Sequence, residues 1–357
     1  MERVKCTIEQ IQELENGLPV EVTGLIRSCQ IKQKTNGEEY AFLTLCDSKS
    51  ETAFPIWDNL DTRLPMLKEG ALIKVLATIN EYNGNKQLKP TAFVLDKLTD
   101  ENIRNFIPSY DFETKYIADI VDILSVVMAL EPKYSSFVYE YLGINTDIVS
   151  ELVNNVLEMC LREEHQVGED DFYKIVLPVI PKQSKFYKLL FAPAAVHHHQ
   201  NKIGGCFLHT YNVVNNVINI LKGYENIDSE FYLKEDIVNK DRLVMCAILH
   251  DIEKTKEYSW ENGIKRNDVK FDHRLLFIKE SEKVNNSFDS PLFDEEELTA
   301  IQELVLTHHG PWGGYKPKTL EGLILFCADW IDANVASCIE NNTTQVDMKI
   351  TRMIDSE

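Results

Sequence analysis

The chain of 357 residues lacks several features that would mark a membrane or secreted protein. It contains no run of about 18 consecutive apolar residues, the length that a membrane span requires. The opening sequence MERVKCTIEQIQELENG has no apolar core of the kind found in signal peptides, which predicts a cytoplasmic protein. The eight cysteines are scattered with no CxxC pair, so their spacing argues against a disulfide framework and excludes a zinc ribbon.

Positive charge is scarce as well, because 37 lysines and arginines stand against 57 aspartates and glutamates, a formal net charge of −20. This balance argues against a protein that binds nucleic acid through bulk electrostatic attraction. The excess is uneven: residues 1–100 hold 12 basic and 15 acidic side chains, and the remaining −17 lies downstream. A phosphate-bearing ligand therefore requires a local basic surface or bound metal ions.

Residues 18–100 alternate between apolar and polar side chains, which is the pattern of half-buried strands. We expect five strands, with tight turns at Asn36-Gly37 and in the NGN sequence of residues 83–85. Five short strands with these turns indicate a small barrel of the OB type over residues 1–100. A five-stranded sandwich is the alternative.

The spacing of apolar residues becomes helical beyond the predicted barrel. Residues 101–181 carry apolar side chains at three- and four-residue intervals and are predicted to form a helical linker region. Long helical linkers often mediate association, so a homo-oligomer is one expectation. Residues 182–357 are predicted to be all-α. The predicted fold class is a multidomain α+β protein with a barrel, a linker and a helical domain.

Histidine is concentrated in the predicted helical domain. Residues 197–210, HHHQNKIGGCFLHT, contain four of the nine histidines. Further imidazoles and carboxylates recur at helix ends or on helix faces, in the order His, His-Asp, His, His-His, Asp. These candidate metal ligands are His209, His250, Asp251, His273, His308, His309 and Asp329. Seven such donors are too many for one transition-metal ion.

A metal centre explains this donor set better than separate structural roles do. The helix dipole favours histidine near a helix C-terminus, so His250, His308 or His309 taken alone could be structural. An aspartate in an apolar helix, such as Asp329, is harder to explain, because an unpaired buried charge is costly. A carboxylate beside a histidine can bridge two ions. Two divalent ions about 3.5–4 Å apart would activate a hydroxide and clamp a phosphoryl group.

The sequence AILHDIEKTKEY resembles the His-Asp core of the HD-domain metal-dependent phosphohydrolases, and the resemblance covers about residues 182–340. It implies catalytic roles for His250 and Asp251. In this family pattern, Asp251 bridges two ions, and Glu253 stands where the family usually has glycine. The ligands implied for the first ion are His209, His250, Asp251 and Asp329, and those for the second are Asp251, His273, His308 and His309.

Lys254 is retained from the family motif and lies four residues after His250. If the helix continues, both residues share one face, and Lys254 could steady a phosphate oxygen or the nucleophile. A solvated surface lysine is the alternative. The histidine-rich donor set disfavours magnesium, so two manganese ions are the first expectation for the cofactors, with Fe²⁺, Co²⁺ and Mg²⁺ as alternatives.

The barrel, the helical region and the sequences HHH…GG..LH and LTHHGPWGGYKPK together are similar to YhaM-type 3′→5′ exoribonucleases over nearly the whole chain. The resemblance implies two-metal hydrolysis of single-stranded RNA from the 3′ end, with single-stranded DNA as a further substrate. Residues 197–210 are also similar to HD-type conjugative relaxases. Because the HD fold hosts several chemistries, a nucleotide or cyclic-nucleotide phosphohydrolase and a non-catalytic nucleic-acid-binding regulator remain alternatives.

The predicted barrel contains the two ingredients of a single-strand binding groove, aromatic side chains and a few cations. The aromatic candidates are Tyr40, Phe42, Phe54, Trp57 and Tyr82, and the interleaved cations are Lys32, Lys34, Lys86 and Lys89. Half or more of the aromatics should belong to the core, because alternate strand residues face inward. Tyr82 beside the turn, Lys86 and Lys89 are favoured over Phe42 and Phe54.

Two further segments are candidates for substrate contact. A Gly- and Pro-rich loop after the paired histidines holds Trp312, Tyr315, Lys316 and Lys318. Trp312 would provide a stacking platform for a base, or would pin the loop to the protein. One of the histidines at 197–199 is expected to contact phosphate or nucleotide, with His198 and His199 as candidates. A histidine-rich surface loop is the alternative.

Overall fold

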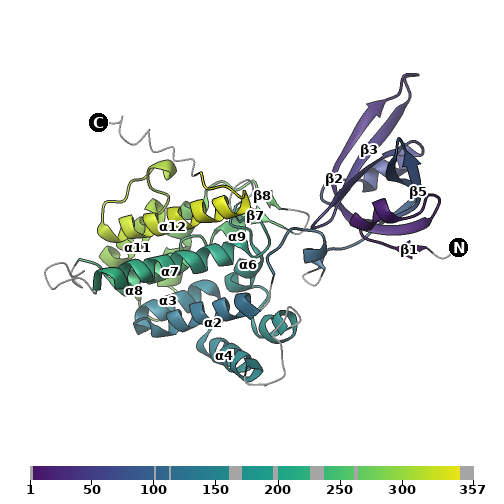
Figure 1. Cartoon of the computed structure of the whole chain (residues 1–357). Helices are drawn as coiled ribbons and strands as arrows, with labels where there is room; N and C mark the ends of the chain where they lie inside the picture. Colours follow the sequence, from purple (N-terminus) through teal and green to yellow (C-terminus); the bar gives the residue numbers. More distant parts are fainter. Residues whose placement is uncertain are drawn as a thin grey trace. The chain divides into compact units, whose positions relative to one another are not determined.

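The computed structural model describes residues 3–99, 102–111, 114–160, 171–195, 200–225, 237–260 and 264–345. The chain divides into two compact units (Figure 1). The first comprises Met1–Ser109 with Ser259–Lys265, and the second comprises Tyr110–Tyr258 with Arg266–Glu357.

The first unit contains one sheet with the strand order β4-β3-β2-β5-β6. Its strands are β1 (Val4–Lys5), β2 (Pro19–Gln33), β3 (Glu39–Cys46), β4 (Glu51–Ile56), β5 (Leu72–Tyr82) and β6 (Asn85–Leu95). The short β1 pairs parallel with β2, and the other pairings are antiparallel. The long β2 pairs with β5 over Pro19–Leu25 and with β3 over Leu25–Gln33.

The two outer strands of this path, β4 and β6, lie next to each other, so the sheet curls into a barrel. A five-stranded antiparallel barrel with a doubly paired first strand is the OB-type architecture, and the predicted fold class is confirmed. Short helical turns are interspersed: η1 (Glu9–Glu13), α1 (Leu60–Arg63), η2 (Leu64–Met66) and η3 (Ile103–Asn105).

Alternation along the strands builds the barrel core. In β3, Ala41, Leu43 and Leu45 are fully buried, and the residues between them are not. At Gly24, a β-carbon would lie 2.6 Å from the Leu45 side chain, so only glycine allows β2 to pass this close to β3. The predicted turn between β5 and β6 is present, with positive φ angles at Asn83 and Gly84.

The second unit is helical. Its longer helices are α2 (Thr114–Ala129), α3 (Pro132–Leu142), α4 (Thr146–Cys160), α6 (Lys185–Phe191), α7 (Gly205–Glu225), α8 (Lys240–Leu249), α10 (His273–Asn285), α11 (Glu295–Thr307) and α12 (Leu320–Glu340). Shorter elements are η4 (Phe172–Val176), η5 (Leu177–Val179), α9 (Lys254–Glu257) and η6 (Gly310–Gly313). The two-residue strands β7 (Tyr258–Ser259) and β8 (Lys265–Arg266) pair with each other.

Several helices begin where a short polar side chain caps the first turn. The side chains that accept hydrogen bonds from first-turn amides belong to Ser184, Asn239, Asp272, Asp294 and Thr319. Such a cap contributes about 1 kcal/mol to the stability of a helix. The caps at Asp272 and Thr319 set the start of α10 and α12, two helices that carry residues of the site described below.

The segment predicted as a helical linker is helical, but its helices pack inside the second unit. Helix α3 contacts α8 and α10, and α2 contacts α7. The reason is the apolar face of α3: Tyr134, Phe137 and Tyr141 are buried and pack against the rings of Phe293 and Phe277. A face of this size needs a partner, so α3 is an integral part of the helical unit.

Helix α12 is long and apolar enough to cross a membrane by length and composition. It nevertheless carries two buried carboxylates, those of Asp329 and Asp332, and it packs against α7, α8 and α11. These contacts make α12 a core helix of the second unit.

Candidate metal centre

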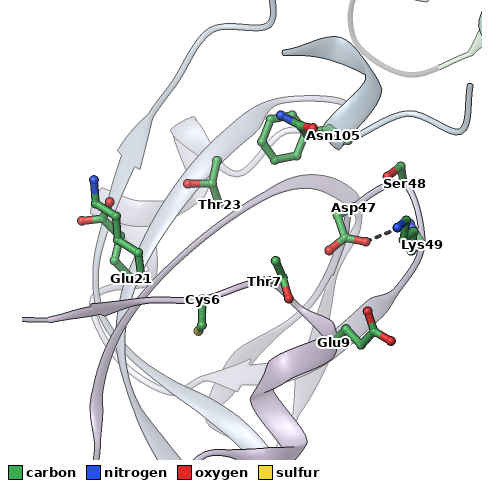
Figure 2. A pocket seen from close by; sticks show the side chains of 11 residues that line it. Cys6, Thr7, Glu9, Glu21, Thr23, Asp47, Ser48, Lys49 and Asn105 are labelled. Atoms are coloured by element: carbon green, nitrogen blue, oxygen red, sulfur yellow. Dashed lines mark hydrogen bonds between the residues drawn. The ribbon is translucent and has the colours of Figure 1, made fainter. Parts of the chain in front are cut away.

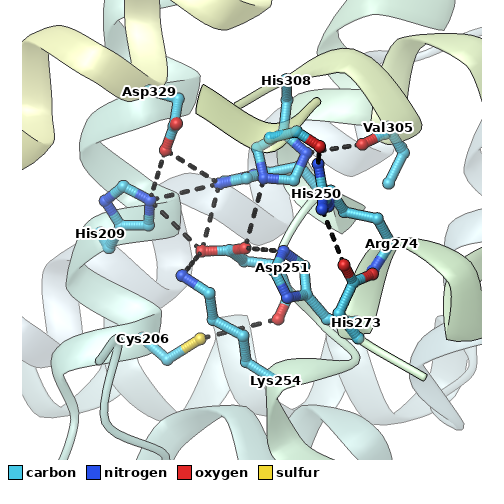
Figure 3. Close-up of polar contacts among 12 residues, drawn as sticks. Cys206, His209, His250, Asp251, Lys254, His273, Arg274, Val305, His308 and Asp329 are labelled. Atoms are coloured by element: carbon cyan, nitrogen blue, oxygen red, sulfur yellow. Dashed lines mark hydrogen bonds and ion pairs between the residues drawn. The ribbon is translucent and has the colours of Figure 1, made fainter. Parts of the chain in front are cut away.

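The structure brings all seven predicted donor residues together in the second unit. Figure 3 labels six of them, all except His309. All seven lie at the ends or on the faces of helices that meet at one point. His209 lies in the second turn of α7, His250 and Asp251 follow the last residue of α8, and His273 is the first residue of α10. His308 and His309 follow α11, and Asp329 lies in the middle of α12.

One group of donors comprises His209, His250 and Asp329, whose ligand atoms lie within 4.8 Å of one another. His209 Nε2 is 2.9 Å from Asp329 Oδ1 and 3.3 Å from His250 Nε2. Asp251 Oδ2 completes the group, at 3.4 Å from His209 Nε2 and 3.5 Å from His250 Nε2. Ligands that bind one ion at about 2.0–2.2 Å are separated by roughly 3 Å or slightly more, as these atoms are.

A second group comprises Asp251, His273, His308 and His309. Here Asp251 uses its other oxygen: Oδ1 lies 3.3 Å from His273 Nε2 and 3.6 Å from His308 Nε2. The two oxygens of one buried carboxylate thus face two separate sets of imidazoles. This is the arrangement of a carboxylate that can bridge two cations.

Backbone carbonyl groups fix the Nδ1 atoms of two of the rings. His250 Nδ1 is 2.7 Å from the Ala247 carbonyl oxygen, and His308 Nδ1 is 2.6 Å from the Val305 carbonyl oxygen. A carbonyl only accepts, so Nδ1 donates in both rings and the Nε2 lone pair points into the centre. This tautomer is the one that binds a metal.

Two carboxylates that were not predicted as ligands lie beside two other rings, those of His209 and His273. Asp332 Oδ2 lies 2.7 Å from His209 Nδ1, and Glu257 Oε1 lies 3.3 Å from His273 Nδ1. Glu257 also accepts a hydrogen bond from the His273 backbone amide. The three-residue spacing from Asp329 on one helical face was the only sequence signal for Asp332. Nothing in the sequence pointed to Glu257.

Burial and neighbouring charge set the protonation of the imidazoles. Burial lowers the pKa of His250 to about 3 and also lowers the pKa values of His273 and His309. Burial acts in the same direction on His209, but the carboxylates of Asp251 and its neighbours outweigh it and raise its pKa well above 6.5. Three of the rings are therefore neutral near pH 7, the form that ligates metals.

The donor atoms fit divalent cations. Asp251 Oδ1, both ring nitrogens of His273 and Nε2 of His308 are buried and make no well-formed hydrogen bond within the described part of the chain. Asp251 Oδ2 makes none either, but it contacts the ammonium group of Lys254. A buried polar atom left in this state costs about 1–3 kcal/mol, and more when it is charged. Imidazole and carboxylate donors aimed at a common point relieve that cost by binding a transition-metal ion.

Lys254 is a buried member of the site, which excludes its interpretation as a solvated surface lysine. Its Nζ lies 2.5 Å from Asp251 Oδ2. Burial alone would lower the pKa of Lys254, but the negative charge of Asp251 raises it above its usual value. Conversely, burial alone would raise the pKa of Asp251, and the positive charge of Lys254 is the largest influence that holds it well below its usual value. Lys254 therefore carries a permanent positive charge beside the donor groups.

The candidate substrate residues of the helical unit do not line one common cavity. Trp312 lines a cavity of about 420 Å³ together with Lys254, His309 and Asp329, directly beside the donor groups. Lys316 lines a different cavity, with Arg242 and Glu321. His198 and His199 lie outside the described residues.

The barrel residues predicted to bind substrate differ in exposure and in whether their polar groups are already used. Tyr82 is 65% exposed at the β5–β6 turn, and Lys89 is exposed on β6. Lys86 uses its ammonium group to donate to the Leu14 carbonyl oxygen at 2.5 Å. Phe54 is completely buried in the barrel core, which removes it as a stacking group.

Two aromatic contacts on the barrel involve candidate residues other than the favoured Tyr82, Lys86 and Lys89. Tyr40 and Trp57 stack at 4.6 Å between ring centroids, and Lys34 lies 5.4 Å from the Trp57 ring. Lys32 lies 4.3 Å from the Phe42 ring.

The barrel also has a cavity of about 400 Å³, which contains none of the predicted substrate residues (Figure 2). Its lining includes the polar side chains of Thr7, Glu21, Thr23, Asp47 and Asn105. Asp47 Oδ1 already accepts from two backbone amides, those of Lys49 and Ser50. The lining mixes acidic, basic and neutral groups and has no cluster of one charge.

Comparison with known proteins gives matches to part of the helical unit and to about nine tenths of the chain. Residues 207–334 match the family model of the HD domain. The chain is similar to a protein of Listeria welshimeri named 3′-5′ exoribonuclease YhaM, at 23% identity over 92% of this chain and 89% of the relative. A protein of the same name from Bacillus licheniformis is 24% identical over 90% of this chain and 87% of the relative.

Among solved structures, the second OB-fold domain of replication protein A from Methanococcus maripaludis is similar to the barrel. It is 14% identical, and the alignment covers 27% of this chain and 98% of that domain with a TM-score of 0.21.

Proposed function

We propose that this protein, in which an OB-type barrel precedes a region matching the HD domain, is a metal-dependent 3′→5′ exoribonuclease acting on single-stranded RNA. The proposal takes its direction and substrate from relatives named 3′-5′ exoribonuclease, which align with about nine tenths of this chain. The reaction is the hydrolysis of a phosphodiester bond, which releases nucleotides one at a time from the 3′ end.

One observation carries the proposal: a buried carboxylate shared by two sets of imidazoles inside an HD domain. His209, His250 and Asp329 would hold one ion, and His273, His308 and His309 the other, with Asp251 between them. The imidazole-rich donor set favours manganese over magnesium. Bound ions of this kind supply Lewis-acid polarisation of a phosphate and lower the pKa of a water molecule.

The chain itself supplies fixed positive charge and orientation. The ammonium group of Lys254 is buried beside Asp251 and borders the cavity, so it stands where negative charge grows on an attacked phosphate. Asp332 and Glu257 hold two of the histidine rings in place, and two backbone carbonyls hold the rings of His250 and His308. A rigid site of this kind needs little reorganisation during the reaction.

The outer face of β2, β3 and β4 supports single-strand binding by the barrel. Lys32 pairs with Tyr40 across the β2–β3 ladder, so the two side chains share one face of the sheet. Trp57 is 53% exposed, and it stacks on Tyr40 beside Lys34. Exposed rings interleaved with lysines suit unpaired bases and their phosphates, since each stacked base contributes about 1–3 kcal/mol.

A nucleotide phosphohydrolase is the second candidate, favoured by the net charge of −20 and by a cavity of about 420 Å³ beside the donor groups. A cavity of this size admits one small ligand. A non-catalytic regulator would be favoured if Glu253, in place of the usual glycine, disrupted the donor groups, but this side chain is directed toward Lys185 and Tyr141 of other helices. Glu253 therefore leaves the donor groups intact.

The test uses 5′-labelled single-stranded RNA, the purified protein and manganese. We expect a ladder that shortens from the 3′ end, and no ladder after treatment with a chelator. RNA that stays intact in manganese, iron and cobalt would overturn the proposal. Hydrolysis of nucleotides without cleavage of RNA would favour the second candidate. Salt separates the two further, because binding of a polymer weakens steeply with salt and binding of a small substrate does not.

A further inference from the structure

The cavity beside the donor groups continues along α12 beyond the proposed catalytic residues. Lys254, His309 and Asp329 line one end of it. The same cavity is lined further along α12 by Ala333, Asn334 and Ser337, which no part of the metal centre uses. With a rise of 1.5 Å per residue, the helix carries this wall roughly 12 Å from Asp329 to Ser337. That length matches a single nucleoside extending away from a phosphate.

Aromatic rings form the side of this cavity. The rings of Trp312 and Trp330 are nearly parallel, with an interplanar angle of 7° and centroids 6.1 Å apart. Phe326 packs against Trp312 at 5.5 Å. Trp312 is 48% exposed, so part of its ring stays open to a ligand. A flat aromatic surface of this kind accepts any base by stacking, because every base has a π-face.

Asn334 and Ser337 are the polar side chains in this part of the cavity, and the Ser337 hydroxyl already accepts from Asn341 Nδ2. Asn334 Nδ2 donates to the Trp330 carbonyl oxygen at 2.7 Å, which fixes the orientation of the Asn334 amide. Its Oδ1 accepts no hydrogen bond within the described part of the chain, and it is a pure acceptor. A hydroxyl group is the donor that such an oxygen selects. In a terminal nucleotide, the 2′-hydroxyl is the group that separates RNA from DNA.

We propose that this cavity binds the 3′-terminal nucleoside of the strand, with its base against Trp312 and its 2′-hydroxyl donating to Asn334 Oδ1. The inference rests on the exoribonuclease function proposed above and assigns the choice of ribose over deoxyribose to Asn334. The selection is made at the terminal nucleotide, in the helical unit, and requires no contribution from the barrel.

The test uses two RNA oligonucleotides that are identical except for a 2′-deoxynucleotide at the 3′ end of one of them. The initial rate of removal of the terminal nucleotide is measured for the wild-type protein and for Asn334→Ala. One neutral hydrogen bond corresponds to roughly a two- to tenfold difference in rate. We expect the wild-type protein to remove the ribonucleotide faster by this factor, and Asn334→Ala to remove both at the same rate.

Asn286→Ala is the matched control, because the Asn286 side chain makes the same kind of bond, from Nδ2 to the carbonyl oxygen four residues earlier. It lies at the end of α10 and lines no cavity described above. Alanine is favourable in a helix, so both variants should fold. The control should keep the wild-type preference for the ribonucleotide.

A second measurement follows binding without turnover. Adenosine 5′-monophosphate is titrated against the intrinsic tryptophan fluorescence of the wild-type protein, Trp312→Phe and Trp260→Phe. We expect quenching in the wild-type protein and in Trp260→Phe, and a clear loss of the quenching signal in Trp312→Phe. Quenching that persists unchanged in Trp312→Phe would overturn the placement of the base.

The outcomes separate this inference from the proposed function. If the wild-type protein degrades both oligonucleotides at equal rates, the role of Asn334 is wrong and the exoribonuclease function stands. If the preference survives in Asn334→Ala, the 2′-hydroxyl is read elsewhere and the inference is again wrong. If neither oligonucleotide is degraded, the proposed function fails, and the inference fails with it.

Discussion

Asp251 faces His209 with one carboxylate oxygen and His273 with the other. Its Oδ2 lies 3.4 Å from His209 Nε2, and its Oδ1 lies 3.3 Å from His273 Nε2. The two histidines come from α7 and α10, so this one carboxylate connects both donor groups. A change at Asp251 should therefore disturb both groups, whereas a change at any single histidine should disturb one.

Asp251→Asn removes the negative charge and one ligand oxygen and keeps the size of the side chain. We expect the manganese content per chain to fall in both groups and the rate of RNA degradation to fall by more than about 100-fold. Loss of a hydrogen bond that merely orients a metal ligand already lowers metal affinity or activity by about 10–100-fold, so loss of a shared ligand should have a larger effect. Elemental analysis and the RNA ladder measure the two effects. Asp289→Asn, at an exposed loop position, is the control. Full metal content in Asp251→Asn would show that Asp251 is not a shared ligand.

Asp332 should act through His209. Its carboxylate holds His209 Nδ1 and also accepts from Asn212 and Gln200. We expect Asp332→Asn to weaken manganese binding by about 10–100-fold, because a neutral amide oxygen holds His209 Nδ1 less strongly than a carboxylate and makes the ring a less basic ligand. Calorimetric titration with manganese measures the affinity. Asn216→Ala is the matched control, since Asn216 also links α7 to α12 but touches no donor residue. If both variants lost manganese affinity equally, Asp332 would act only by packing α12 against α7.

Lys254 should affect turnover more than metal content. Its ammonium group lies at the border between Asp251 and the cavity. We expect Lys254→Met to lower kcat by about 10²–10³, the usual loss for one donor aimed at developing charge. Lys279→Met, at an exposed position on α10, is the control. An unchanged kcat at full metal occupancy would exclude a catalytic role for Lys254.

The donor residues could be predicted from the sequence because each of them marks a helix end or an apolar helix. His250-Asp251 follows the apolar run of α8, and Asp329 interrupts the apolar run of α12. The residues that hold these donors could not be predicted. Asp332 meets His209 only because α7 packs against α12, and that packing is invisible in either helix alone.

The barrel shows the same limit. The alternation and the turns predict its strands, but the choice of stacking residues depends on strand register. Residue 54 on β4 is paired with Leu43 and is buried, whereas Tyr40 at the start of β3 is paired with Lys32 and lies on the other face. One step in register exchanges the two faces of a strand. Aromatic content alone therefore could not separate Phe54 from Tyr40.

Glu253 replaces the usual glycine of the motif and should stabilise the fold. Its buried carboxylate lies 2.5 Å from Lys185 Nζ and 2.7 Å from Lys256 Nζ, and it accepts from the Tyr141 hydroxyl. Removal of one partner from a buried ion pair costs about 3–5 kcal/mol. We expect Glu253→Gly to lower the free energy of unfolding by this amount, with kcat unchanged at temperatures where the variant is folded.

Chemical unfolding followed by circular dichroism measures that effect. Glu253→Gln, which keeps an acceptor for Tyr141 but loses the charge, should fall between the wild-type protein and Glu253→Gly. An unfolding free energy within about 0.5 kcal/mol of the wild-type value would show that the cluster around Glu253 contributes nothing.

The ion pairs of Glu280 with three lysines should make the folding stability depend on pH. Its carboxylate lies 2.7 Å from Lys283 Nζ, 3.6 Å from Lys256 Nζ and 3.8 Å from Lys185 Nζ. Burial alone would raise the pKa of Glu280, but the hydrogen bond from Lys283 and the charges of the other two lysines lower it below 4.5. The unfolded chain therefore binds more protons just below pH 4.5, so the stabilisation is complete above this pH and is lost as the pH falls through the lower, folded value.

We expect Glu280→Gln to reduce the free energy of unfolding at neutral pH by up to about 1 kcal/mol, since the group is partly exposed. The difference from the wild-type protein should shrink as the pH falls below 4.5 and should vanish once the carboxyl is protonated in both states. Urea unfolding at a series of pH values measures it. Glu282→Gln, an exposed position on the same helix, is the control. A difference that persists at low pH would mean that Glu280 stabilises α10 by packing, because protonation would then leave its contribution intact.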